Sequence, residues 1–222
     1  MTERATPSVD GLVVGILGGT GDQGRGLARR FALAGHQVII GSRSSERADA
    51  AAQEIGHGVQ GLANADAARG ASVIIAAVPW EGHGDLLSAL AGELAGKIVV
   101  DCVNPLGFDQ RGAYALPVAE GSAAEQAAAL LPGSRVVAAF HHVSAVLLLD
   151  PEVDTIDLDV LVLGDDREAT ELVQALAARI PGVRGIYAGR LRNCGQIEAL
   201  TANLVSINRR YKAHAGLRVT DI

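Results

Sequence analysis

The sequence predicts an α/β protein with a doubly wound, mainly parallel sheet and a smaller C-terminal α/β part that ends in a long helix. Two observations lead to this fold class. Short apolar runs rich in β-branched residues alternate with stretches of helical spacing, and a glycine-rich segment directly follows the first apolar run. With 222 residues, the chain has room for one domain, or for one domain and a small addition.

The expected strands are short and apolar, and the first three end at glycine, serine or proline. They lie at residues 12–17, 38–40, 72–78, 97–100, 136–139, 160–163 and 185–187. Between them, apolar positions at three- and four-residue steps predict helices at residues 23–34, 45–55 and 85–94. Strands joined by helices of this length imply crossover connections and a parallel sheet covered on both faces.

The last part of the chain has a different pattern. Residues 193–214 show no strand signal and predict one long helix. Its apolar stripe consists of Ile197, Leu200, Thr201, Leu204, Ile207 and Tyr211. Residues 179–222 hold eight Arg and Lys against two acids. Two interpretations stay open: a solvated basic tail, or a basic wall facing an anionic ligand or a partner subunit.

Composition excludes several classes of function. The net charge of −6 argues against nucleic acid as a partner. Residues 1–11 lack the apolar core of a signal peptide, and the longest uncharged run, residues 136–149, is too short to span a bilayer. Cys102 and Cys194 have no metal-ligand spacing. We therefore expect a cytoplasmic protein with no membrane partner and no metal.

A glycine-rich loop is the strongest motif. Gly19, Gly21 and Gly24 match G-x-G-x-x-G between the first expected strand and the first expected helix. In that context the glycines permit a tight turn, the approach of a diphosphate and close packing of helix on strand. Free N–H groups at the helix start then bind the phosphates. The alternative is a glycine-rich turn without a ligand.

The end of the second strand indicates which dinucleotide binds. An NAD site would carry Asp or Glu there, whereas this chain has Ser42 and Arg43, with Arg47 one turn further. Guanidinium groups and hydroxyls suit an additional phosphate. The sequence therefore favours NADP, although both arginines could instead belong to a solvated helix surface.

Three segments together resemble the F420H2:NADP oxidoreductase family, also called NADPH-dependent F420 reductases. They are residues 15–43, the Pro-Trp-Glu stretch at residues 77–81, and the His-containing loop at residues 140–145. The resemblance implies a Rossmann-type domain over residues 1–145. It also implies a smaller C-terminal domain over residues 146–222 that contributes to a deazaflavin cleft and a dimer contact. The implied reaction is reversible hydride transfer between NADP(H) and coenzyme F420 in a homodimer.

The resemblance also implies roles for individual residues. Thr20, Gly21, Asp22 and Gln23 would lie along the pyrophosphate, and Ser42, Arg43 and Arg47 would hold the 2′-phosphate. Pro79 and Trp80 would lie beside the nicotinamide ribose, and His141 and Ala145 would line the facing rings. The remaining expected cofactor-binding residues are Gly19, Gly24, Val78, Leu106 and Ser144.

Hydride transfer requires two rings stacked with their reacting carbons about 3–3.5 Å apart, and it requires no protein nucleophile. As catalytic residues we expect His141 or His142, donating a hydrogen bond to the deazaflavin edge where negative charge grows. The alternative is that both histidines only orient backbone. Trp80 suits either a core anchor or a cofactor wall.

Other polar groups give weaker signals. Asp165 and Asp166 predict N-cap and first-turn acids of a helix. The acids from Asp150 to Asp159 predict a solvated loop, because they lack calcium-site spacing. The basic residues expected to face an anionic coenzyme tail are Arg190, Arg192, Arg209, Arg210 and Lys212.

Two other functions stay open. The first is an NADPH-dependent reductase of another acceptor, such as a flavin, ferric ion or imine. The second is a non-catalytic NADP sensor.

Overall fold

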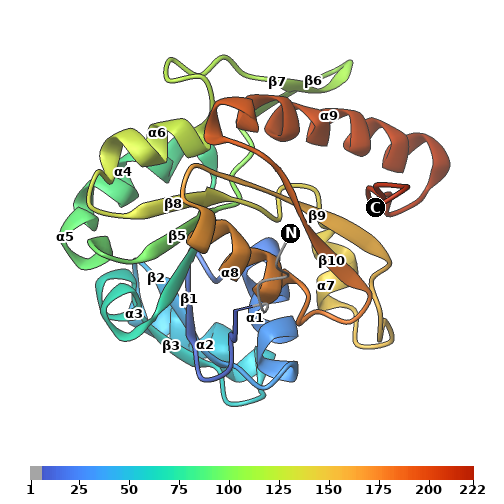
Figure 1. Ribbon diagram of the computed structural model, residues 1–222. Helices are drawn as coiled ribbons and strands as arrows, with labels where there is room; N and C mark the ends of the chain where they lie inside the picture. The colour runs from blue at the N-terminus through green and yellow to red at the C-terminus, as the bar shows by residue number, and fades with distance from the viewer. Residues whose placement is uncertain (1–6) are drawn as a thin grey trace.

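The computed structural model of the protein describes residues 7–222 and contains one central eight-stranded sheet (Figure 1). The strand order is β10-β9-β8-β5-β4-β1-β2-β3. The strands are β1 (Val13–Leu17), β2 (Gln37–Ser42), β3 (Gln60–Ala63), β4 (Val73–Ala76), β5 (Ile98–Asp101), β8 (Arg135–Ala138), β9 (Leu158–Gly164) and β10 (Val183–Gly189). Six neighbouring strands run parallel to one another, in the order β8, β5, β4, β1, β2 and β3. This arrangement confirms the predicted fold class.

Helices cover both faces of this sheet. One core cluster packs α1, α2, α7 and α8 on the first face, and a second packs α3 to α6 and the start of α9 on the other. The helices are α1 (Asp22–Leu33), α2 (Ser45–Ile55), α3 (Asn64–Gly70), α4 (His83–Ala89), α5 (Ala91–Leu94), α6 (Ala123–Leu130), α7 (Ala145–Leu149), α8 (Arg167–Ala177) and α9 (Cys194–Tyr211), with the short turns η1 (Trp80–Gly82) and η2 (Leu191–Asn193). This two-sided cover is the arrangement that a parallel sheet requires.

The predicted elements are present, with four differences. The helix expected over residues 85–94 is two helices, because the backbone at Leu90 leaves the helical region at a φ of −109°. The short strand β3 was not predicted. The helices α3, α6 and α7 and the hairpin of β6 (Leu106–Asp109) and β7 (Gly112–Ala115) were not predicted either. The sheet is also not parallel throughout, because β9 runs antiparallel to β8.

The C-terminal part of the chain joins the same sheet. The strands β9 and β10 pair in parallel with each other and extend the sheet beyond β8. The helix α9 confirms the predicted long C-terminal helix and lies beside the β6–β7 hairpin (Figure 1). The division into two domains near residue 145 stays a prediction.

One group in the predicted acidic loop is not solvated. Asp159 is fully buried at the start of β9, where its carboxylate accepts hydrogen bonds from Arg184 at 2.7 and 2.6 Å and from Arg218 at 2.8 Å. The backbone N–H of Val219 donates to the same carboxylate at 2.6 Å. The bonds from Arg184 contribute most to holding the pKa of Asp159 well below its usual value. The prediction of a solvated loop is therefore wrong for this residue, because its partners come from distant parts of the chain.

Two predictions concern targeting. Within residues 7–222, no helix is both long enough and apolar enough to cross a bilayer. The expectation that the start of the chain lacks a signal-peptide core rests on residues 1–11, of which residues 1–6 lie outside the described residues.

Candidate functional site

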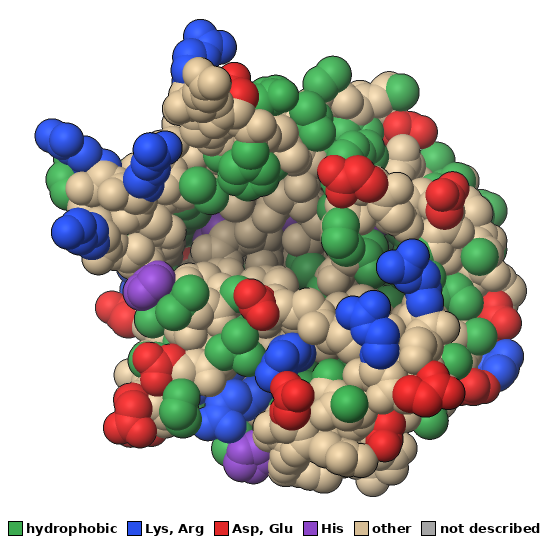
Figure 2. All heavy atoms as spheres, turned by 180° about the vertical axis from the view of Figure 1, so that it is seen from behind, with side chains coloured by type: hydrophobic (Ala, Val, Ile, Leu, Met, Phe, Trp, Pro, Cys, Tyr) green, Lys and Arg blue, Asp and Glu red, His purple; other side chains and the backbone are tan. Residues whose placement is uncertain are grey.

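The candidate site is a cavity at the carboxyl ends of β1, β2 and β4. Its volume is about 750 Å³. It is lined by Gly18, Thr20, Gly21, Ser42, Arg43, Arg47, Asn64, Ala77, Val78, Pro79, Glu81, Gly82, Asp85 and Leu86. Ligands of open α/β sheets bind at this edge, where the strand order reverses between β1 and β4. Figure 2 shows this side of the molecule hollowed, with basic side chains at the edges of the hollow.

The three glycines of the predicted motif have different surroundings. A Cβ added to Gly19 would lie 2.5 Å from the Cβ of Ile40, and one added to Gly24 would lie 2.7 Å from the Cα of Gly19. At Gly21 the nearest atom would be 3.7 Å away, and Gly21 lines the cavity. Gly19 and Gly24 therefore serve close packing, whereas Gly21 leaves open space above the loop.

The start of α1 fits a diphosphate. The helix begins at Asp22, and its N-cap, Gly21, has no side chain to bond the first amides. These N–H groups are therefore available to phosphate oxygens, and the helix dipole adds positive potential. Thr20 lines the cavity beside them. Gly19, Asp22, Gln23 and Gly24 do not line it, although all belong to the predicted loop.

The residues predicted to hold a 2′-phosphate meet in the same cavity. Ser42 is the last residue of β2, and Arg43 and Arg47 are exposed and line the cavity. Within the described residues neither arginine forms an ion pair, so both guanidinium groups are available to an anion. The hydroxyl of Ser44 accepts from the Arg47 N–H at 3.2 Å and fixes the start of α2.

The segment after β4 forms one wall of the cavity. The predicted residues Val78 and Pro79 line it, whereas Trp80 does not. The Trp80 ring instead lies 5.5 Å from the ring of His83. Trp80 is half-buried, so the core-anchor and cofactor-wall interpretations both stay open.

The His-containing loop lies outside the lining of this cavity. His141 is buried, and neither of its ring nitrogens has a hydrogen-bond partner among the described residues. Burial lowers the pKa of His141 to about 4, so its ring is neutral at pH 7. The backbone carbonyl of His141 accepts from Asn104 at 2.8 Å and from Thr201 at 3.3 Å. The ring thus retains an unused donor, while its backbone is fixed from the segment after β5 and from α9.

His142 has a different environment. Its Nε2 lies 2.8 Å from the carbonyl oxygen of Asp159, to which it donates. This bond agrees with the interpretation that His142 orients backbone. Ser144 lies within 3.4 Å of His214, and Ala145 begins α7. These residues and Leu106, the first residue of β6, are not brought into the 750 Å³ cavity.

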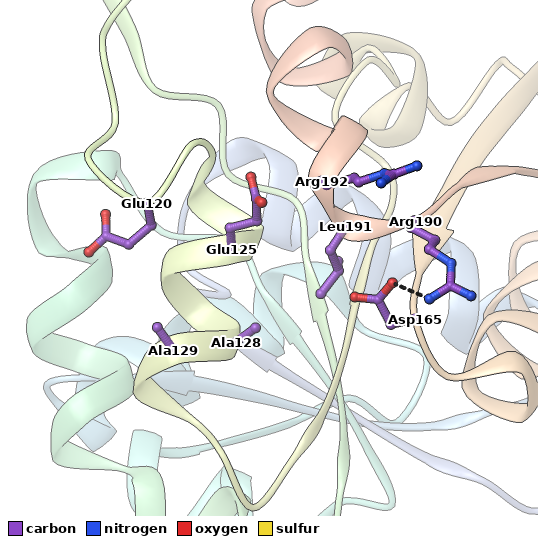
Figure 3. Close-up of a pocket in the computed structure, with 8 residues that line it drawn as sticks. All are labelled: Glu120, Glu125, Ala128, Ala129, Asp165, Arg190, Leu191 and Arg192. Carbon is purple, nitrogen blue, oxygen red and sulfur yellow. Dashed lines mark ion pairs between the residues drawn. The ribbon is translucent and has the colours of Figure 1, made fainter.

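The basic residues expected to face a coenzyme tail are spread over different places. Arg190 and Arg192 line a separate cavity, where Arg190 points toward Asp165 at 3.8 Å and Glu120 and Glu125 lie opposite (Figure 3). Arg209 and Arg210 line another cavity beside the β6–β7 hairpin. These four arginines therefore line two separate cavities and do not form one basic wall. The helix-cap prediction, by contrast, is confirmed for Asp166, which accepts from the Ala169 N–H at 2.8 Å.

Sequence reasoning missed part of the cavity lining. The missed residues are Gly18, Asn64, Ala77, Glu81, Gly82, Asp85 and Leu86. Most of them flank predicted ones and could have been found by extending each motif by a few residues. Asn64 follows β3, so it could not be placed without that strand.

Fold and cavity together define a dinucleotide-binding protein of Rossmann type. The chain belongs to the family described as "NADP oxidoreductase coenzyme F420-dependent", whose family model matches residues 13–105. It is 39% identical over 221 residues to the F420-dependent NADP reductase of Methanothermobacter thermautotrophicus, covering 94% of this chain and 95% of that relative. The F420-dependent NADP reductase of Methanocaldococcus jannaschii is likewise 39% identical, with 94% and 98% covered.

A solved structure supports the same relationship. The crystal structure described as a putative F420-dependent NADP reductase from an Arthrobacter species superimposes with a TM-score of 0.81 at 29% identity. It covers 95% of this chain and all of that one. The predicted family is therefore confirmed.

Proposed function

We propose that this protein transfers a hydride reversibly between NADP(H) and coenzyme F420. One observation carries the proposal. In a member of this family, the open glycine loop lies in a single cavity at the sheet edge with Arg43 and Arg47, which form no ion pair within residues 7–222. A diphosphate on the α1 amides and a 2′-phosphate on Arg43 and Arg47 together suit NADP rather than NAD.

The two coenzymes supply the chemistry, which is a hydride passed from one ring carbon to the other. The protein's own residues bind and orient. Gly21 lets the diphosphate approach the backbone, and Ser42 and Arg43 hold the phosphorylated end. Val78 and Pro79 form the wall on the β4 side. Together these residues fix the length and direction of the dinucleotide along the sheet edge.

The acceptor side includes the loop of His141. Its neutral ring has an N–H with no partner among residues 7–222, which we propose donates to the acceptor ring where negative charge develops. His142 positions this loop through its bond to Asp159. Ser144 and Ala145 are small and permit close approach of a planar ring. We further propose a homodimer, a smaller C-terminal domain from residue 146 and a cytoplasmic location.

The test mixes purified protein with NADPH and oxidised F420 and follows the loss of the deazaflavin's visible absorbance. We expect rapid loss with F420, and none with FMN, FAD or ferric complexes at the same concentration. Turnover with those acceptors alone would favour a reductase of another acceptor. NADPH binding without any turnover would identify a sensor.

A further inference from the structure

A polar cluster with two fully buried members lies beneath the β4-side wall of the cavity. We call it the His83 cluster, and it consists of His83, Asp101 and Gln126. The His83 Nε2 lies 2.6 Å from an Asp101 carboxylate oxygen, and its Nδ1 lies 3.0 Å from the Gln126 side-chain oxygen. His83 and Asp101 have no solvent exposure. Hydride transfer as described above uses none of these three groups.

The hydrogen bonds determine the charge on His83. The Gln126 amide nitrogen donates to Glu120 at 3.3 Å, so the amide oxygen faces His83 and accepts from Nδ1. The Asp101 carboxylate accepts from Nε2, and its other oxygen accepts from the Val103 N–H at 3.0 Å. Both ring nitrogens therefore carry hydrogens, which makes His83 an imidazolium.

The surroundings agree with this charge. Burial opposes protonation, but the hydrogen bond and charge of Asp101, the bond to Gln126 and the nearby Glu198 together raise the pKa of His83 above its usual value. The Trp80 ring lies beside the His83 ring, with the two ring centroids 5.5 Å apart. The imidazolium and the carboxylate thus form a compact ion pair with its remaining hydrogen-bonding capacity satisfied.

The position of the cluster connects it to the site. Residues on both sides of His83, at 79–82 and at 85–86, include wall residues of the cavity. Asp101 is the last residue of β5 and pairs in register with Ala76, the last residue of β4. The ion pair therefore ties the wall directly to the carboxyl edge of the sheet.

The strand order shows which half of the dinucleotide this wall faces. The proposed 2′-phosphate site lies at the end of β2, on one side of β1. The strands β4 and β5 lie on the other side of β1, where the nicotinamide half of a Rossmann dinucleotide extends. The cluster therefore supports the reacting half and not the adenosine half.

We propose that His83 and Asp101 are positioning residues for hydride transfer: their buried ion pair holds the wall at residues 79–82 so that the nicotinamide lies at reacting distance. The proposal rests on the proposed function for the identity of the acceptor. Because displacement by about 1 Å costs roughly a hundredfold in rate, loosening this wall affects turnover more than binding of the phosphates.

The first experiment compares Asp101→Asn with the unmodified protein. We expect kcat to fall about tenfold to a hundredfold, while KM for NADPH changes by less than about threefold. Affinity for adenosine 2′,5′-bisphosphate, which lacks the nicotinamide half, stays unchanged. Equal losses of affinity for NADPH and for the bisphosphate would overturn the proposal, and so would an unchanged kcat.

A second variant covers the case in which Asp101→Asn does not fold. Gln126→Met removes the Nδ1 acceptor from α6 without touching the cavity lining. We expect a smaller fall in kcat, with the affinity for the bisphosphate retained. Turnover equal to that of the unmodified protein would contradict the proposal. The matched control is His36→Asn, which removes another buried imidazole outside the site and should reduce stability without changing kcat.

A third measurement needs no turnover. Nitrogen NMR of the His83 ring should show two protonated nitrogens at pH 7, and Asp101→Asn should convert the ring to the neutral form. A neutral ring in the unmodified protein would overturn the proposal. If the protein reduced no F420, the proposed function would fail, whereas the ring protonation state and the two binding affinities would still test the positioning role of the cluster.

Discussion

The side-chain amide of Gln23 donates to the backbone carbonyl of Phe140 at 3.2 Å. This bond joins α1, the helix after the glycine loop, to the loop that carries His141. The family resemblance implies a place for Gln23 along the pyrophosphate, whereas its side chain has a partner on the proposed acceptor side. The bond therefore links the positions of the two proposed coenzyme sites.

Replacing Gln23 by Met should lower kcat several-fold with little change in KM for NADPH, because the loop of His141 loses one tether while the α1 amides remain. Steady-state kinetics with NADPH varied at saturating F420 measure both constants. Gln53→Met, on the exposed surface of α2, is the control. A rise in KM for NADPH with constant kcat would indicate instead that Gln23 binds the pyrophosphate.

The glycines of the loop allow a matched pair of variants. Gly21→Ala should leave the melting temperature unchanged, because the new Cβ meets nothing closer than 3.7 Å. It should raise KM for NADPH about tenfold or more, since the methyl group occupies the approach of the diphosphate. Gly24→Ala should lower the melting temperature by about 2–8 °C, because its Cβ would lie 2.7 Å from backbone. Normal NADPH affinity in Gly21→Ala would exclude the loop as the diphosphate site.

Arg43→Ala should raise KM for NADP by about one to two decades with little change in kcat, because a charge-assisted hydrogen bond contributes about 1.5–3 kcal/mol. The preference for NADP over NAD should fall by the same factor. Arg167→Ala, which removes a guanidinium from the surface of α8, provides the control. An unchanged preference would show that the 2′-phosphate binds elsewhere.

His141→Ala should lower kcat about tenfold to a hundredfold, and His141→Asn should lower it less because Asn keeps a donor. Since burial lowers the pKa of His141 to about 4, its protonation should add no pH dependence to kcat between pH 6 and 8. His142→Ala should lower kcat several-fold, because the loop of His141 loses one tether. It should also lose about 1–3 kcal/mol of stability, because the Asp159 carbonyl loses its donor. Turnover unchanged in His141→Ala would exclude the donor role.

Glu198 should make stability depend on pH. It is buried and accepts from the N–H groups of Ala123 and Ala124 at 2.9 and 3.2 Å, and burial raises its pKa to about 7. Between about pH 4.5 and 7 the folded protein binds more protons at this site than the unfolded chain. Its contribution to the free energy of unfolding therefore falls as pH rises through that window.

Glu198→Gln removes this dependence. We compare the free energy of unfolding of the variant with that of the unmodified protein. As pH rises from 4.5 to 8, the difference should change in favour of the variant by up to about 3 kcal/mol. Urea unfolding at several pH values measures the shift. Glu168→Gln, on the exposed surface of α8, should show none. Parallel pH profiles for Glu198→Gln and the unmodified protein would contradict the raised pKa.

Local signals made most of the parallel strands from β1 to β5 predictable. The strand β1 and the helix α1 are separated by a glycine loop of recognisable spacing, and α2 has its predicted bounds because Ser44 caps it. The strand β3, with the sequence Gln-Gly-Leu-Ala, lacks the β-branched residues on which strand prediction depends. Strand direction is not encoded in hydrophobic periodicity, so the reversal between β8 and β9 could not be seen.

The site was predictable where its residues directly follow a strand. Gly21, Ser42 and Arg43 meet because the ends of neighbouring parallel strands share one edge. The pair of His83 and Asp101 was not predictable, because the two residues come from different elements and no spacing rule links them. Buried charges of this kind are recognised only when both partners are placed in space.

The contacts of Asp159 with Arg218 and Val219 have a practical consequence. Removing residues 217–222 would leave this buried carboxylate with Arg184 as its remaining side-chain donor, beside the backbone that holds His142. Shortened versions for crystallisation should therefore retain these residues. An affinity tag is better fused to the amino-terminal end, so that purification does not disturb the packing around β9.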